Sequence, residues 1–214
     1  MFKINLSRDS DYHTQLNNKI YPLEACGPTS AANCLEIIGM AKQFPGDMQL
    51  EDRIMGKLQS PEAFNLMAEI APWAINRYKP NEVHLMLQWA VNILIGKQVD
   101  KFIEYGCLEH AAFNLAAGRP IIMSGSFTRG GHMVAIIGFM SLQQEEDFRD
   151  ETKIDLSKIL EFFVDDSYGN YFTKYQDHRG NNIGFPVGLL NELTNVSWKN
   201  GNKHMHIFNG EGWT

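Results

Sequence analysis

The sequence predicts an α+β fold in which helices come first and a sheet follows. Between residues 27 and 118, apolar residues recur at the three- and four-residue spacing of helices. After Pro120 they form short runs rich in β-branched and aromatic residues, which is typical of strands. Because the two kinds of element are segregated along the chain, an α+β architecture is favoured over an alternating one. The 214 residues, 44% of them hydrophobic, fit a single domain spanning 1–214.

The first predicted helix covers residues 27–39. Pro28 suits its first turn, and Gly39 suits its C-terminus. Its apolar residues share one face: Ala31, Cys34, Leu35 and Ile38. Cys26 is therefore expected to stand at the N-terminus of a helix.

Residues 60–118 are predicted to be mostly helical. One helix starts at Ser60-Pro61-Glu62, a second starts at Pro80-Asn81-Glu82, and a third ends at Gly118. Four strands are predicted, at residues 121–123, 132–139, 159–164 and 204–208. The acid-rich residues 143–157 are expected to form a solvated hairpin loop between two of these strands.

Charge and cysteine content exclude several classes of protein. The formal net charge is −6 and no lysine- or arginine-rich block is present, so nucleic acid is not expected as a partner. No apolar stretch has the length of a signal peptide or a membrane span, so we expect a cytoplasmic protein with no membrane partner. The three cysteines do not make a disulfide framework, which leaves free thiols available for chemistry.

Cys26 is the candidate nucleophile. A thiol at a helix N-terminus meets the positive end of the helix dipole and unpaired backbone N–H groups, which favour the thiolate. The alternative is that Cys26 is a small buried hydrophobe. Cys34 falls on the apolar face of the same helix and is expected in the core, and Cys107 has no evident partner.

His132 is the candidate base among seven histidines. It opens an apolar strand directly after Arg129-Gly130-Gly131, so the sheet would hold a side chain that still reaches the sheet edge. The alternative is a partly buried structural histidine.

Asp166 is the candidate for the carboxylate that fixes the imidazole tautomer. Alternation along the strand puts Asp166 on the face of Val164, whereas Asp165 points the other way. The alternative is that this stretch is simply a turn. Gln15, eleven residues before Cys26, could donate to an oxyanion, although surface solvation is its default role.

Together these residues resemble the bacteriocin-processing-type, papain-like cysteine peptidase family. The resemblance runs from about Tyr12 to Pro186, and four strings carry it in order: Tyr12-His13-Thr14-Gln15, Ala25-Cys26-Gly27-Pro28-Thr29-Ser30, Gly130-Gly131-His132-Met133-Val134 and Asp166-Ser167-Tyr168-Gly169-Asn170. It implies a papain-like fold and peptide hydrolysis through a thioester. The implied roles are Cys26 as nucleophile, His132 as base, Asp166 as orienting group and Gln15 in the oxyanion hole. Family members often carry proline where this chain has Ser167, so Asp165 stays open as the alternative.

The resulting hypothesis is a stand-alone cysteine peptidase that needs no cofactor or metal. Its substrate would be a peptide, either a protein or, by analogy with phage-type endolysins released at host lysis, a peptidoglycan peptide. Two alternatives remain: a papain-like acyltransferase, and an inactive binding or inhibitory protein on a peptidase scaffold. His204 and His206 have the spacing of a metal pair, but no third ligand lies nearby in the sequence.

Overall fold

The computed structural model describes residues 1–41, 47–195 and 202–213, and in these ranges it contains a seven-stranded sheet. The sheet has the order β2-β7-β3-β4-β5-β6, with β1 paired to β4 off this path. Every pairing is antiparallel. The strands are β1 (Phe2–Asn5), β2 (Asp100–Gly106), β3 (Ile121–Gly125), β4 (His132–Ser141), β5 (Ile159–Asp165), β6 (Ile183–Pro186) and β7 (Lys203–Phe208).

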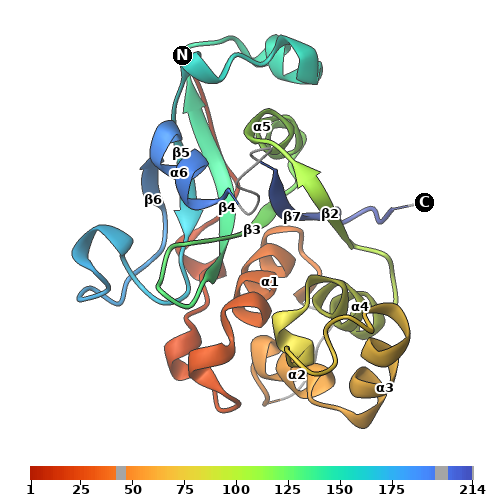
Figure 1. Ribbon diagram of the computed structural model, residues 1–214. Helices are drawn as coiled ribbons and strands as arrows, with labels where there is room; N and C mark the ends of the chain where they lie inside the picture. The colour runs from red at the N-terminus through yellow and green to blue at the C-terminus, as the bar shows by residue number, and fades with distance from the viewer. Residues whose placement is uncertain (42–46, 196–201, 214) are drawn as a thin grey trace.

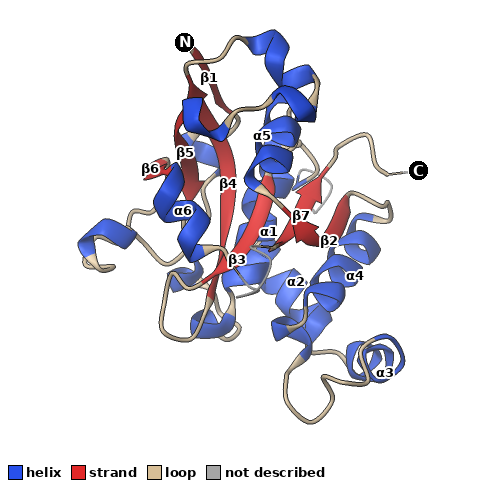
Figure 2. Cartoon of the chain, turned by 45° about the horizontal axis from the view of Figure 1, so that its top comes forward, coloured by secondary structure: helices blue, strands red, loops and turns tan. Residues whose placement is uncertain are grey.

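Helices cover both faces of this sheet (Figures 1 and 2). On one face lie α1 (Cys26–Ile37) and α4 (His84–Ile95), with α2 (Leu50–Leu58) and α3 (Pro61–Ile70) packed against them. On the other lie α5 (Leu108–Ala116) and α6 (Val187–Leu193). None of the helices in the described ranges is long and apolar enough to cross a membrane.

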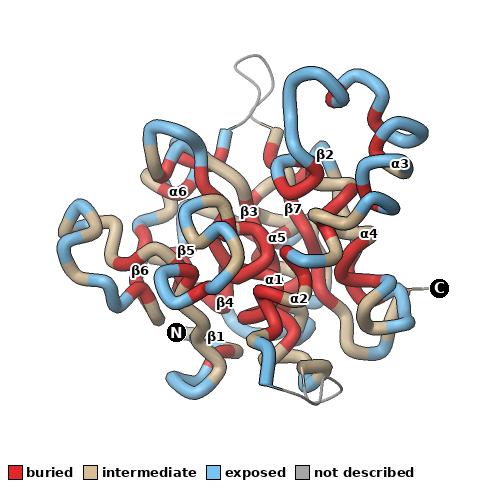
Figure 3. The backbone as a smooth tube through the Cα atoms, turned by 90° about the horizontal axis from the view of Figure 1, so that it is seen from below, coloured by how far each residue is buried: buried red, intermediate tan, exposed pale blue. Residues whose placement is uncertain are grey.

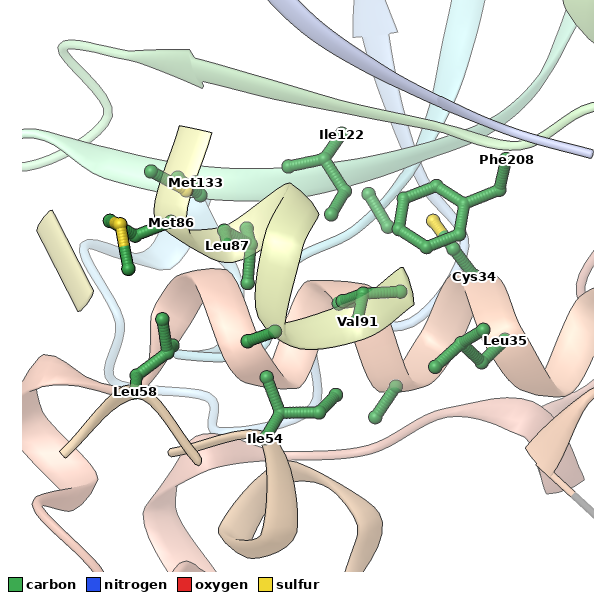
Figure 4. Close-up of a cluster of buried hydrophobic side chains, with 14 of the residues drawn as sticks. Cys34, Leu35, Ile54, Leu58, Met86, Leu87, Val91, Ile122, Met133 and Phe208 are labelled. Carbon is green, nitrogen blue, oxygen red and sulfur yellow. The ribbon is translucent and has the colours of Figure 1, made fainter. Parts of the chain in front are cut away.

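Two hydrophobic cores share the sheet as their common wall. Ile122 and Ala135 face the core under α1 and α4, whereas Ile121 and Ile136 face the core under α5. Figure 4 shows the first core, in which Cys34 of α1 lies among the side chains of α4 and the sheet, as predicted. Because both faces of the central strands are covered, these strands are continuous apolar runs in the sequence. The buried segments of Figure 3 accordingly gather along β3, β4 and α1.

The mixed helix and antiparallel-sheet fold confirms the predicted class, but three strands were not predicted. The predicted helix at 27–39 corresponds to α1, and the four predicted strands correspond to β3, β4, β5 and β7. The prediction that residues 60–118 are mostly helical is wrong at β2, which pairs with β7, and the prediction of helices before sheet is wrong at β1. β2 is an edge strand with several exposed side chains, so its local pattern lacks an apolar signal.

The connection between β4 and β5 is ordered rather than fully solvated. It forms three short 3₁₀ turns, η6 (Glu145–Arg149), η7 (Glu151–Lys153) and η8 (Leu156–Lys158). Phe148 is 2% exposed, and its ring lies 4.6 Å from the ring of Phe139 and 5.3 Å from that of Phe2. The predicted hairpin connection between two strands is therefore found, and this buried aromatic ring anchors its otherwise largely solvated, acidic segment.

Gly138 marks the closest approach of β1 to β4. A Cβ atom at this position would lie 2.2 Å from the backbone oxygen of Ile4 in β1. We expect Gly138→Ala to lower the free energy of unfolding by about 1–3 kcal/mol, because β1 must shift to accept the methyl group. Urea denaturation followed by far-UV circular dichroism measures the change.

Gly188→Ala provides the matched control. Gly188 is exposed in α6, and a Cβ atom there would have no neighbour within 4 Å. Alanine favours the helix by up to about 1 kcal/mol, so this variant should be as stable as the parent or more stable. Equal losses in the two variants would contradict a close contact between β1 and β4 at Gly138.

Candidate active site

Cys26 is the first residue of α1, and no side chain caps the N-terminus of this helix. The half-buried thiol therefore faces the positive end of the helix dipole. Ser30 holds α1 to the sheet by donating its hydroxyl to the carbonyl oxygen of Met133, at 3.0 Å. Gly27 permits this close packing, since a Cβ atom there would stand 3.0 Å from the Met133 sulfur. The start of α1 and the start of β4 are thus brought together.

His132 begins β4 and is only 6% exposed. Its Nε2 atom lies 2.7 Å from Oδ1 of Asp166, so the N–H of this nitrogen donates a hydrogen bond to the carboxylate. The His132 side chain is also close enough to the Cys26 thiol that each group shifts the pKa of the other. Since Nε2 is engaged by Asp166, Nδ1 is the ring nitrogen left for Cys26. The structure therefore brings Cys26, His132 and Asp166 together, with a hydrogen bond between His132 and Asp166.

Asp166 follows β5 and is completely buried. Its Oδ1 atom also accepts the backbone N–H of Tyr168, at 3.0 Å. Its own backbone N–H donates to the carbonyl oxygen of Gly180, at 2.8 Å. The Tyr12 hydroxyl donates to the Asp166 carbonyl oxygen at 2.8 Å and accepts the N–H of Gly180 at 3.1 Å. The carboxylate is thereby held in one position beside the histidine.

Asp165 lies on the other side of the strand, away from His132. Its two carboxylate oxygens accept the Ser7 hydroxyl at 2.7 Å and the Asn182 N–H at 2.8 Å. Burial raises the pKa of Asp165 to about 6 in spite of these donors. Of the two adjacent aspartates, Asp166 is the one that contacts the histidine.

Gln15 is buried at the start of the 3₁₀ turn η2 (Gln15–Asn17), where Ser167 fixes its amide group. The Ser167 hydroxyl donates to Gln15 Oε1 at 2.8 Å, and the backbone N–H of Gln15 donates to the Ser167 carbonyl oxygen at 3.0 Å. Gln15 Nε2 donates to the carbonyl oxygen of Pro22, at 2.9 Å, in the turn η3 (Pro22–Glu24) that precedes Cys26. An amide nitrogen carries two protons, so one N–H remains for a ligand.

The electrostatics of the site favour a charged pair. Burial alone would raise the pKa of the Cys26 thiol, but the hydrogen bond and charge of His132, with the backbone N–H groups of Met133 and Gly27, lower it overall. Burial would likewise lower the pKa of His132, but its contacts with Asp166 and Cys26 raise it to about 10. The two opposite pKa shifts favour a thiolate beside an imidazolium, the reactive form of a nucleophilic cysteine.

Two residues that complete the site had no assigned role in the sequence. Tyr12 and Ser167 stand inside the motif strings, but the partners they bind are about 150 residues away along the chain. The departure from proline at Ser167 was the available signal, because a serine hydroxyl can donate to the Gln15 amide oxygen and a proline ring cannot.

A second histidine cluster lies between α4 and β7, apart from this site. His206 uses both ring nitrogens on the protein: Nδ1 lies 2.8 Å from Asp100 Oδ2, and Nε2 lies 3.0 Å from His84 Nδ1. Within the described ranges no group of three or more His, Cys, Asp or Glu side chains could hold a metal ion. Of the histidine pair in the sequence, His206 is thus part of a packed polar network, and His204 contacts the rings of His84 and Phe102.

Comparison with known proteins gives a consistent result. The model of the Peptidase C39-like family matches residues 8–187, which include all four candidate residues. A crystal structure of a protein from Bacillus anthracis, described as a C39-like peptidase, superimposes with a TM-score of 0.56 over 98% of each chain. At 13% sequence identity this likeness shows a shared fold and nothing more. No curated protein matches the chain.

The three cysteines allow a test of the thiolate within one molecule. We expect iodoacetamide to label Cys26 about tenfold or more faster than Cys107 near pH 7, because burial and Glu109 raise the pKa of Cys107. His132→Ala removes the charge that lowers the Cys26 pKa, so the Cys26 rate profile should move to higher pH while that of Cys107 stays. Mass spectrometry of labelled peptides measures both rates. An identical pH profile at the two cysteines would exclude the ion pair.

Proposed function

Because the chain belongs to the Peptidase C39-like family, we propose that it is a cysteine peptidase with Cys26 as its nucleophile. His132 serves as general base and acid, Asp166 orients the histidine, and Gln15 contributes to the oxyanion hole. The observation that carries this proposal is the placement of the Cys26 thiol beside His132, which is itself hydrogen-bonded to Asp166. This is the arrangement that activates a thiol for attack on an acyl carbon.

The reaction would begin with attack of the Cys26 sulfur on the carbonyl carbon of a peptide bond. The negative charge that develops on the carbonyl oxygen would be met by the N–H of Cys26 and the free N–H of Gln15. The C–N bond then breaks, and the His132 imidazolium gives its proton to the departing nitrogen. The acyl group remains on sulfur as a thioester.

Hydrolysis of the thioester completes the cycle. His132, now neutral, takes a proton from water, which attacks the thioester carbon and displaces the Cys26 thiolate. Asp166 keeps the imidazole in the tautomer that presents Nδ1 to the reaction and stabilises the imidazolium each time it forms. Transfer of the same acyl group to an amine instead of water would give an acyltransferase, which amine-dependent product would reveal.

The complete set of partners around the thiol supports an active enzyme over an inactive binding scaffold. A site that had lost its activity would gain nothing from keeping an imidazolium buried beside a carboxylate, because the burial of charged groups is costly. A peptidoglycan peptide as substrate is suggested by analogy with endolysins alone. Release of amino groups from purified peptidoglycan, compared with release from denatured casein, tests that choice.

The two adjacent aspartates allow a controlled test of the proposed activity. We expect the protein to cleave peptides in a casein digest, Cys26→Ala to abolish cleavage, and Asp166→Asn to reduce kcat by about 10²–10⁴-fold. Since Asp166 raises the His132 pKa, its loss should also move the alkaline limb of the pH–rate profile to lower pH. Asp165→Asn should leave that limb in place, because Asp165 does not contact His132. Identical pH profiles for the two variants would refute the role of Asp166.

The proposed role of Gln15 in the oxyanion hole is tested by comparing two rates: peptide cleavage, which forms an oxyanion, and alkylation of the Cys26 sulfur, which does not. Gln15→Ala should lower kcat by about 10²-fold, the effect of losing one oxyanion donor. It should leave the alkylation rate of Cys26 unchanged, because alkylation forms no oxyanion. Ser167→Ala frees the Gln15 amide, so we expect a smaller loss of kcat with the same unchanged alkylation. Slower alkylation in Gln15→Ala would show that Gln15 acts on the thiolate instead.

A further inference from the structure

A pocket of about 630 Å³ opens beside the candidate histidine, where the β3–β4 loop meets the segment that follows β5. Its walls are mostly aromatic: Phe127, Tyr168, Tyr171, Phe172 and Tyr175. The ring of Phe172 is 51% exposed although it lines the pocket, so apolar surface is available to a ligand.

Three of these rings pack directly around His132. Their centroids lie 6.4 Å (Phe127), 6.2 Å (Tyr168) and 6.5 Å (Tyr175) from the centroid of the imidazole. The Tyr175 hydroxyl donates to the Phe127 carbonyl oxygen at 3.2 Å, which joins the two loops that form the pocket. The pocket therefore lies against the aromatic side chains that surround His132.

The pocket also carries positive charge. Arg129 and Lys174 are exposed in its lining, and no carboxylate lines it. The structure shows no ion pair for either cation within the described part of the chain. In a protein of net charge −6, two such cations beside aromatic walls complement a ligand that combines an apolar group with a carboxylate.

The direction of the reaction decides which part of a substrate reaches this pocket. In the proposed mechanism His132 gives its proton to the departing nitrogen, so the residue that carries this nitrogen lies on the histidine side. We propose that the pocket binds the side chain of the residue after the scissile bond, and that it selects an aromatic or large aliphatic residue with a carboxylate next to it. This inference rests on the proposed peptidase function.

The carboxylate could be an acidic side chain on the next residue or the free C-terminus of the substrate, and the experiment separates the two. A library of synthetic peptides covers all residues at the two positions after each bond, with amidated and free C-termini. It is digested with the wild type and with Cys26→Ala as blank. We expect Phe, Tyr or Leu followed by Asp or Glu to be cleaved at least about tenfold faster than Gly followed by Lys. Preference for bonds one residue from a free C-terminus would instead identify the terminal carboxylate.

A binding measurement makes the inference independent of turnover. Calorimetry with Cys26→Ala compares the tetrapeptide amide Phe-Asp-Ala-Ala with Phe-Lys-Ala-Ala and Gly-Asp-Ala-Ala, which stand in for the released product. Phe-Asp-Ala-Ala should bind most tightly. The double variant Arg129→Gln, Lys174→Gln should bind Phe-Asp-Ala-Ala about fivefold more weakly and Phe-Lys-Ala-Ala with unchanged affinity. Phe172→Ala should lower the affinity for both peptides that begin with Phe.

The outcomes separate the pocket from the enzyme. Cleavage with no preference for the residues after the bond, or equal binding of the three peptides, contradicts the proposed role of the pocket but not the peptidase activity. Selective binding without cleavage of any library peptide contradicts the peptidase activity but not the role of the pocket. If the protein shows no binding and no cleavage, both proposals are wrong.

Discussion

The hydrogen bond between His132 and Asp166, 2.7 Å long and closed to solvent, is the contact on which the rest of the site depends. It requires β4 and β5 to be neighbours in a register that pairs Ala135 with Asp165, so that the strands present their ends side by side. It also requires the chain after β5 to return against Asp166. A Cβ atom at Gly180 would lie 1.9 Å from the Asp166 carbonyl oxygen, so a glycine is needed at this crossing.

Burial of this pair has an electrostatic consequence. A charge removed from water must be balanced within the protein, and here each member of the chain balances the next. The carboxylate stabilises the imidazolium, and the imidazolium stabilises the thiolate. The aromatic rings around His132 keep water away, which strengthens both interactions. The same rings form the walls of the pocket, so one set of residues sets both the charge state of the histidine and the shape beside it.

Local pattern predicted the elements that are rich in buried apolar side chains. α1, β3, β4, β5 and β7 belong to this group, and alternation along the end of β5 placed Asp166 and Asp165 on opposite faces. β1, β2 and β6 escaped prediction because they are short or partly exposed and are held by partners far along the chain. The links from Tyr12 to Asp166 and from Ser167 to Gln15 were hidden for the same reason, since each joins residues more than 150 positions apart.

β7 is the last strand in the sequence, yet it lies inside the sheet between β2 and β3. Among the described strands β2 pairs with β7 alone, so β2 cannot join the sheet until residues 203–208 are in place. During synthesis on the ribosome, this long-range pairing is completed only after every catalytic candidate has already been translated. Addition of β2 to the sheet is thus a late step of folding, which follows translation of Cys26, His132 and Asp166.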